Sequence, residues 1–311
     1  MTGGCSGIGL ETAKVLHTWN ATIILGCRNS ARARHACKSV EQARLGDVVA
    51  DNRPVCMMWE LDLSSFLSIR SFVSKFHRSG LDLHILVNNA GIRDDSLIVS
   101  PDNIEMHYHI NHLGPFLLTN LLLPSLRRSR WPNPRIVHVS SSAHAFGKID
   151  RIQYGLEKRN TDARLFESTQ SNRLEGVYGD TKLMQVMFSN ELQRRIDLEI
   201  DKNCKFCNRV ISLAIHPGFV STEFGADDER MLQTAVLLLR PLIARNSSQG
   251  AITQIIAATL DSPDIVGGQY MENGAVSLAA DRAYDKDDWE WLWNISSILT
   301  DLNDDMRSKN G

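Results

Sequence analysis

Short apolar runs alternate with longer amphipathic stretches along most of the 311-residue chain. The apolar runs have the length and character of strands buried on both faces of a parallel sheet, and they occupy residues 21–26, 54–63, 81–88, 134–139 and 209–214. Helical spacing of apolar residues marks the segments between them, at 10–19, 30–46, 65–78 and 101–128. This alternation predicts an α/β fold of the Rossmann type, a doubly wound parallel sheet with helices on both faces.

The second half of the chain continues the pattern after an interruption. Residues 145–174 are mostly polar and indicate a surface insertion, whereas residues 223–246 indicate either an apolar lid or a core helix. A helix at 247–260, a short strand near 268–271 and a tryptophan-rich tail follow. We expect one domain over 1–311, with a cofactor half of about 1–140 and a catalytic and substrate half of about 135–311.

Charge and cysteine content narrow the class of protein. The net charge is −2 with both signs interspersed, which argues against nucleic acid or anionic membrane as a partner. No segment approaches the about 18 apolar residues of a membrane span, and no signal peptide is visible, so we expect a cytoplasmic protein, or a membrane-associated form if a segment precedes this sequence. The six cysteines lack a framework spacing, which is typical of a reducing compartment, and the lone Cys204-x-x-Cys207 predicts no metal site.

The chain opens on a glycine-rich segment, TGGCSGIG, directly before a helix. Glycines permit a tight turn and close approach of the backbone to a pyrophosphate, which would then lie at the helix N-terminus where amide donors favour anions. A flexible terminus is the plainer interpretation, but the position before a helix favours a dinucleotide site. The candidate contacts are Gly3, Ser6, Gly7, Ile8 and Gly9.

Further candidate cofactor residues follow the predicted strands. Arg28 stands after the strand at 21–26 with no acid beside it, which favours the 2′-phosphate of NADP over the ribose of NAD, although an exposed arginine is the alternative. Asp62 and Leu63 end the next predicted strand, where a carboxylate could reach the adenine edge. The remaining candidates lie in turns after later strands, and they are Asn89, Ala90, Gly91, Pro217, Gly218, Val220 and Thr222.

Tyr178 and Lys182 are the candidate proton-transfer pair. Four residues apart on a helix, they share a face, so the ammonium is expected to lower the pKa of the phenol from about 10 towards working pH. A second pair has the same spacing, Tyr154 and Lys158, but it lies in the polar insertion. Apolar residues at helical spacing follow Tyr178 and predict a rigid, buried helix, namely Leu183, Met184, Met187, Phe188 and Leu192. We therefore choose Tyr178 and Lys182.

Two polar residues complete the candidate catalytic set. Ser141 follows the strand at 134–139, and parallel sheets place ligands at this end of their strands. Asn111 lies among apolar residues, where a buried amide needs partners; it either stabilises a helix kink or holds a water in a proton relay.

Taken together, the motifs TGGCSGIG, LDL, NNAG, INHLG, VSSS, YGDTK and HPGFVST resemble, in order, those of the short-chain dehydrogenase/reductase family. Within it the chain is most similar to the group of retinol dehydrogenases and WW-domain-containing oxidoreductases, although WW domains are absent. The resemblance implies hydride transfer between a nicotinamide and a small lipophilic alcohol or carbonyl, such as a retinoid or steroid. It also implies that Ser141 polarises the substrate oxygen, Tyr178 transfers the proton, Lys182 lowers the phenol pKa and holds the nicotinamide ribose, and Asn111 supports a water relay.

One departure from the family concerns the first strand. Family members have an apolar strand of about six residues before the glycine-rich loop, whereas this sequence has only Met1. That strand lies at the centre of the 3-2-1-4-5-6 order, so its loss is expected to leave two inner edges unpaired. Either the sequence start is truncated or cofactor is held poorly, and the second case leaves an alternative function, a non-catalytic interaction protein on a dehydrogenase fold. Helix faces in 101–128 and 178–198 could also pair in a homo-oligomer.

Overall fold

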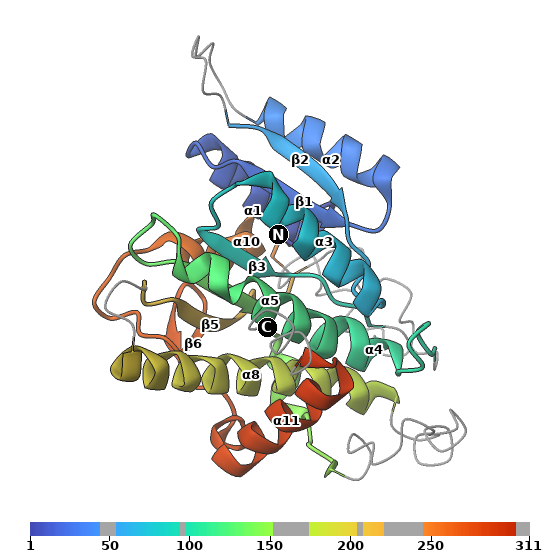
Figure 1. Cartoon of the computed structure of the whole chain (residues 1–311), viewed down its shortest axis with the longest axis vertical. Coiled ribbons are helices and arrows are strands. Elements are labelled where there is room, and N and C mark those ends of the chain that lie inside the picture. The colour runs from blue at the N-terminus through green and yellow to red at the C-terminus, as the bar shows by residue number, and fades with distance from the viewer. Residues whose placement is uncertain (44–53, 94–97, 152–173, 204–207, 221–244, 303–311) are drawn as a thin grey trace.

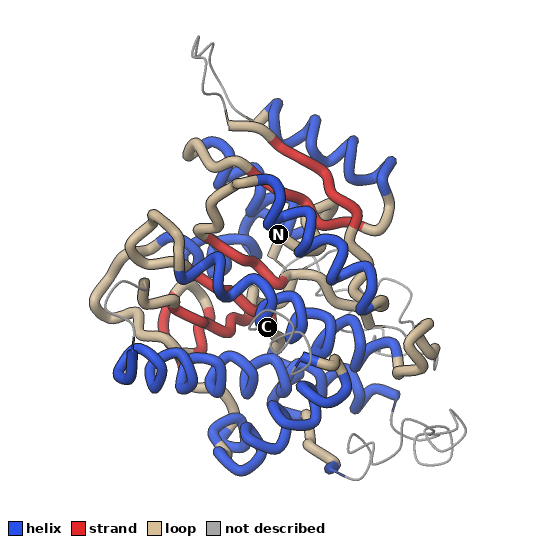
Figure 2. The backbone as a smooth tube through the Cα atoms, in the orientation of Figure 1, coloured by secondary structure: helices blue, strands red, loops and turns tan. Residues whose placement is uncertain are grey.

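The described part of the chain forms a mostly parallel sheet between two layers of helices (Figures 1 and 2). The structure is a computed structural model, and it describes residues 1–43, 54–93, 98–151, 174–203, 208–220 and 245–302. This arrangement confirms the α/β fold that the alternating pattern predicts.

Within the described residues the sheet has seven strands, and each of the five apolar runs overlaps one of them. They are β1 (Ile23–Cys27), β2 (Cys56–Glu60), β3 (Ile85–Asn88), β4 (Arg135–Val139), β5 (Ile211–His216), β6 (Tyr270–Glu272) and β7 (Ala275–Ser277). β1 pairs with β2, and the others follow in the order β3-β4-β5-β6-β7, all parallel except the final pair. Sequence reasoning missed β7. The signal for it was Asn273-Gly274, whose φ values of 54° and 78° suit a tight hairpin.

Met1 and Thr2 fill the centre of the sheet between β1 and β3. The Met1 amine donates to the Ile24 carbonyl at 2.8 Å, and the Gly26 N–H donates to the Met1 carbonyl at 2.9 Å. On the other side the Thr2 N–H donates to the Val87 carbonyl at 3.0 Å. The prediction that both inner edges are unpaired is therefore wrong where Met1 and Thr2 lie, because the backbone of these two residues hydrogen-bonds to β1 on one side and to β3 on the other.

Helices cover both faces of the sheet (Figure 1). One layer contains α3 (Phe66–Ser79), α5 (Gly114–Arg127) and α8 (Leu174–Asn203), with α11 (Lys286–Leu299) packed on α8. The other contains α1 (Gly7–Thr18), α2 (Ser30–Gln42) and α10 (Ser247–Thr259). Shorter helical pieces are α4 (Met106–Tyr108), the π-helical turn η1 (His109–Leu113), and the 3-10 turns η2 (Ser142–Phe146) and η4 (Asp281–Tyr284).

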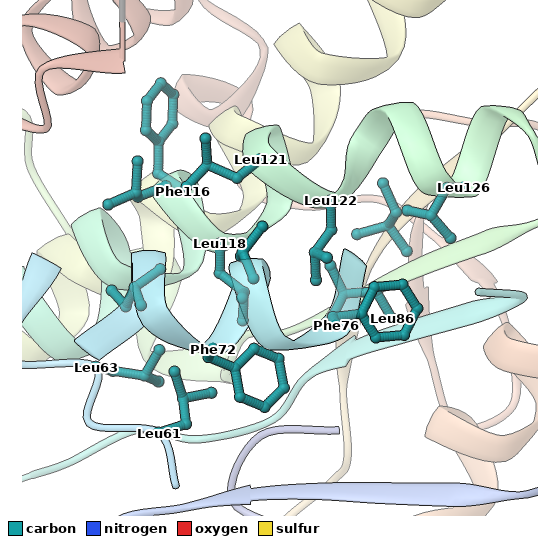
Figure 3. Close-up of a cluster of buried hydrophobic side chains, with 14 of the residues drawn as sticks. Leu61, Leu63, Phe72, Phe76, Leu86, Phe116, Leu118, Leu121, Leu122 and Leu126 are labelled. Atoms are coloured by element: carbon teal, nitrogen blue, oxygen red, sulfur yellow. The ribbon is translucent and has the colours of Figure 1, made fainter. Parts of the chain in front are cut away.

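The largest cluster of buried side chains lies between α3, α5 and β3 (Figure 3). Phe72 and Phe76 extend from α3, with Phe76 next to Leu86, while Leu118 and Leu122 come from α5. The predicted apolar residues of α8 are also buried, which confirms a rigid helix after Tyr178: Leu183, Met184, Met187, Phe188 and Leu192. Burial all round α8 follows from its position between the sheet and α11.

Cysteine pairing departs from the sequence-based expectation. Cys5, in the glycine-rich loop, forms a disulfide with Cys27 at the end of β1, although their spacing of 22 residues gave no sign of it. The thiols of Cys37 and Cys56 are free, with 2.6 Å between their sulfur atoms. The spacing of the cysteines therefore did not indicate this pair, which comes together only because the loop meets the end of the strand.

Several predictions fall outside the described residues. They concern the part of the insertion with Tyr154 and Lys158, the segment 223–246 up to residue 244, Thr222, and the Cys204-x-x-Cys207 pair. Within the described ranges, none of the helices combines the length and apolar character needed to cross a membrane.

Candidate active site

The glycine-rich loop turns tightly into α1. Gly3 and Gly7 have φ values of 63° and 54°, in the left-handed region that favours glycine. A Cβ on Gly3 would stand 2.8 Å from the Ala90 Cα, and one on Gly9 would stand 2.4 Å from the Gly3 carbonyl oxygen. Ser6 is exposed at the N-terminus of α1, and Ile8 is half-buried in its first turn. The loop thus presents the start of a helix, where backbone N–H groups attract anions.

Thr2 and Asn89 bind this loop to the end of β3. The Asn89 side-chain amide donates to the Gly3 carbonyl at 2.9 Å, and the Thr2 hydroxyl accepts from the Asn89 and Ala90 N–H groups at 3.1 and 3.0 Å. The Asn89 side chain therefore holds the glycine-rich loop in place through its hydrogen bond to Gly3. Gly91 lies further along, where an added Cβ would stand 3.2 Å from both Asn111 Oδ1 and Lys182 Nζ.

The candidate adenosine corner lies at the ends of β1 and β2. Arg28 is exposed directly after β1. One carboxylate oxygen of Asp62 accepts from the Ser64 N–H at 2.9 Å and from the Ser64 hydroxyl at 2.6 Å, so it already has local partners. Leu63 is buried in the core, and its carbonyl lies against Gly114.

A turn after β5 contributes the other side of the candidate cofactor site. Pro217 is buried, and Gly218 has a φ of 87°, with the Arg245 side chain so close that an added Cβ would meet it at 2.8 Å. Val220 forms a bridge with Arg245 and reaches Gly250 of α10. This turn holds three of the four predicted residues in place.

Ser141, Tyr178 and Lys182 come together where β4 ends against α8. Ser141 caps η2, with its hydroxyl oxygen accepting from the Ala143 N–H at 3.2 Å, and it forms a side-chain hydrogen bond with Tyr178. Lys182 Nζ lies 5.5 Å from the centroid of the Tyr178 ring, as expected for a shared helix face. The hydroxyl of Tyr178 is therefore next to Ser141.

Burial dominates the electrostatics of the pair. It raises the pKa of Tyr178 to about 12, while the hydrogen bond from Ser141 and the charge of Arg93 act in the opposite direction. Burial also lowers the pKa of Lys182 to about 7. The predicted fall in the phenol pKa is thus wrong for this structure, because burial disfavours the charged phenolate more than the hydrogen bond from Ser141 and the charge of Arg93 stabilise it.

Arg93 is a cation beside the phenol that sequence reasoning missed. Its guanidinium carbon lies 5.6 Å from the centroid of the Tyr178 ring. Only its position shortly after the motif Asn89-Ala90-Gly91 could have suggested it, since that motif already marked a strand end at the candidate site.

Asn111 lies in the π-helical turn η1 and is completely buried. Its side chain accepts from the Ile92 N–H at 2.8 Å and donates to the Ile92 carbonyl at 3.0 Å and to Thr181 Oγ1 at 3.1 Å. Its backbone carbonyl accepts from the Gln185 side chain at 2.7 Å. Asn111 therefore ties the segment after β3 to α8, and its support of a water relay stays a prediction.

Comparison with known proteins decides the family. The model of the family described as short chain dehydrogenase matches residues 1–161. Human polyprenol dehydrogenase is 31% identical over 98% of this chain and 85% of its own length, and mouse retinol dehydrogenase 12 is 31% identical over 96% and 84%. The chain belongs to the short-chain dehydrogenase family. A third relative, the short-chain dehydrogenase TIC 32 B of Brassica napus chloroplasts, is 33% identical over 97% and 88%.

Solved structures agree with this membership in the short-chain dehydrogenase family. A protein of Mycobacterium paratuberculosis has a TM-score of 0.67 at 28% identity, covering 96% of this chain and 91% of its own. An alcohol dehydrogenase of Thermococcus sibiricus, solved with 5-hydroxy-NADP, has a TM-score of 0.58 at 18% identity over 89% and 95%, which supports the fold alone. The predicted likeness to retinol dehydrogenases is confirmed, and that to WW-domain-containing oxidoreductases stays a prediction.

The residues of this short-chain dehydrogenase fit a nicotinamide dinucleotide. Gly3 and Gly9 leave no room for a Cβ, the N-terminus of α1 is open at Ser6, and Arg28 is exposed at the next strand end. The protein is therefore an NAD(P)-dependent oxidoreductase with a small-molecule substrate.

Sequence reasoning also missed two polar residues that organise this site. A lone threonine beside glycines, such as Thr2, gives no sign in the sequence of the two N–H groups that its hydroxyl accepts from. A glutamine on a buried helix, such as Gln185, is usually a structural residue, so its sequence position alone does not indicate a role at the site. His144 accepts from the Ala280 N–H at 3.0 Å and contacts the Ser141 carbonyl at 2.7 Å.

Proposed function

We propose that the protein transfers a hydride between NADP(H) and a lipophilic alcohol or carbonyl. The observation that carries this proposal is the hydrogen-bonded contact of Ser141 with Tyr178, beside Lys182 and next to Gly91. Support for a lipophilic substrate comes from two relatives, whose names describe them as dehydrogenases of polyprenol and of retinol. A cytoplasmic location and a homo-oligomer stay predictions.

The mechanism assigns each side chain one task. The bound nicotinamide supplies the hydride in reduction and accepts it in oxidation. In reduction, the Ser141 hydroxyl donates a hydrogen bond to the substrate oxygen, and Tyr178 gives its proton to that oxygen as the carbon gains the hydride. Lys182 favours the tyrosinate left behind, and returning the proton reverses each step.

The state of Tyr178 in the structure suits proton donation. A phenol with a pKa of about 12 keeps its proton throughout the neutral range, so it is ready to protonate a carbonyl oxygen. In the direction of alcohol oxidation the phenolate is needed, and a positive charge on Lys182 then matters more. Because the pKa of Lys182 is about 7, that charge is lost as the pH rises through neutrality.

Arg28 supports NADP as the preferred form of the cofactor. Its side chain is exposed after β1, and no carboxylate accompanies it between Gly26 and Ser30. A guanidinium matches the geometry of a phosphate, whereas an acid at this place would hydrogen-bond the ribose of NAD.

Replacing Tyr178 by Phe tests the proposed function. The variant lacks the proton donor, so kcat for reduction of a retinoid aldehyde with NADPH should fall by a factor of about 10² to 10⁴, while NADPH affinity is spared. NADPH consumption and fluorescence titration measure the two quantities. Tyr154→Phe is the matched control and should keep its activity; full activity in Tyr178→Phe would refute the role of this residue.

Thermal shifts separate the cofactor forms. Saturating NADPH should raise the melting temperature more than NADH at the same concentration, and Arg28→Gln should remove the difference. Equal shifts in the wild-type protein would contradict the NADP preference. No shift with either would favour the alternative of a non-catalytic interaction protein.

A further inference from the structure

The backbone carbonyl of Asn111 lies where Pro115 removes the α-helical donor. In an α-helix the carbonyl of residue 111 accepts from the N–H of residue 115, but Pro115 has no N–H. The chain passes this point in the π-helical turn η1, and Asn111 is completely buried. In a π-helical turn the backbone donor moves to the fifth residue along the chain, and a carbonyl oxygen has a second lone pair that a buried side chain can use.

Gln185 provides such a side chain. Its side chain is buried on α8, and its Nε2 donates to the Asn111 carbonyl at 2.7 Å. At the other end of the same amide, Oε1 accepts from Lys182 Nζ at 3.3 Å. A carbonyl can only accept and an ammonium can only donate, so the two partners determine which way round the amide lies.

Lys182 depends on this amide for its position. Its Nζ donates to the Val139 carbonyl at 2.9 Å and to Gln185, and both acceptors are uncharged. Gln185 lies one helical turn beyond Lys182. The Val139 carbonyl comes from the last residue of β4, so two rigid elements direct the ammonium towards Tyr178.

We propose that Gln185 is a positioning residue, which uses the buried Asn111 carbonyl as an anchor and holds the Lys182 ammonium beside Tyr178. Its role in turnover rests on the proposed oxidoreductase function. The bridge itself is a property of the folded chain and can be measured without substrate.

The test follows the titration of Lys182 by NMR in protein labelled with ¹³C at lysine Cε, with the signal assigned through Lys182→Arg. The wild-type midpoint is expected at about 7. Gln185→Met keeps the length of the side chain but removes an acceptor that favours the ammonium, so the midpoint should fall by roughly 0.5 to 1 pH unit. Gln185→Glu places a carboxylate beside the ammonium, so the midpoint should rise by roughly 1 unit or more.

Gln193→Met is the matched control. Gln193 is also buried on α8, and its Oε1 accepts from the Ser212 N–H at 2.9 Å, away from Lys182. Its loss should lower the melting temperature and leave the Lys182 midpoint at the wild-type value. Opposite shifts in the two Gln185 variants, with none in the control, are the expected result, because loss of packing alone cannot move the midpoint in both directions.

Unchanged midpoints in both Gln185 variants, or an equal shift in Gln193→Met, would overturn the inference. In turnover, the pH profile of kcat/KM for Gln185→Met should move with its NMR midpoint, and kcat/KM should fall several-fold. If the wild-type protein turns over no alcohol or carbonyl but the midpoints shift as expected, the positioning role stands and the proposed function fails. If the wild-type protein is active and the midpoints do not move, the reverse holds.

Discussion

At the scale of single residues, Thr2 joins the glycine-rich loop to the end of β3. Its buried hydroxyl accepts from the Asn89 N–H at 3.1 Å and the Ala90 N–H at 3.0 Å, at the point where β3 ends. In return the Asn89 side chain donates to the Gly3 carbonyl. One hydroxyl therefore sets the distance between the glycine-rich loop and the strand end that leads to Gly91.

Thr2→Val keeps the shape of this side chain and removes the acceptor. Two N–H groups then lose their partner, so the free energy of unfolding should fall by about 1–3 kcal/mol. NADPH affinity should fall several-fold, because the loop loses its attachment to β3. Urea unfolding and fluorescence titration measure both effects. Thr2→Ser retains the hydroxyl and should behave almost as wild type; a Thr2→Val protein as stable as Thr2→Ser would show that these bonds contribute nothing.

At the scale of elements, the glycine-rich loop is attached to both neighbouring strands. Hydrogen bonds hold it to β3, and the Cys5–Cys27 disulfide holds it to the end of β1, directly before Arg28. The loop that would bind the pyrophosphate and the strand end that would bind the ribose phosphate are thus covalently joined.

Reduction of this disulfide is expected to destabilise the protein. It closes a chain segment of 22 residues, for which the loss of unfolded-state constraint amounts to about 3 kcal/mol. Urea unfolding with and without dithiothreitol measures the difference. Cys5→Ser should be about as stable as the reduced wild-type protein, and adding dithiothreitol should not change its stability. A wild-type stability that reductant leaves unchanged would contradict a stabilising role for this bond.

At the scale of the whole molecule, three buried histidines connect folding to pH. His109, His112 and His138 lie in η1 and β4 and are almost completely inaccessible to solvent. Burial lowers the pKa of His109 to about 4 and those of His112 and His138 to about 3. In His138 the Nδ1 atom lies 3.3 Å from the Asn88 side-chain amide nitrogen, which can only donate, so Nδ1 is the unprotonated acceptor.

These histidines should make the fold sensitive to acid. As the pH falls below 6.5, the pKa of these histidines in the unfolded chain, they bind protons in the unfolded chain but stay neutral in the folded protein. The free energy of unfolding therefore decreases. Each histidine contributes a slope of about 1.4 kcal/mol per pH unit, which is fully developed near pH 5. His138→Phe should make the slope between pH 6.5 and 5 shallower by one such contribution in urea unfolding. Exposed His35→Asn is the control, and an unchanged slope in His138→Phe would contradict this account.

The amino-acid pattern was sufficient for the fold class and for most of the site. Apolar runs and helical periodicity are local properties, so the five strands and the rigid helix after Tyr178 could be predicted. The shared face of Tyr178 and Lys182 follows from helix geometry, and their distance agrees with it. The position of Ser141 at a strand end follows from the parallel sheet.

Only the tertiary structure decided the pKa values of the site residues and the long-range contacts that position them. The pKa of Tyr178 depends on how much water its neighbours exclude, and that reversed the expected direction. The Cys5–Cys27 disulfide and the Gln185 bridge to Asn111 join segments distant in sequence, whose meeting no local pattern encodes. The sequence by itself determined which residues share an element, because periodicity is short-range; burial and long-range contacts arise only when those elements pack.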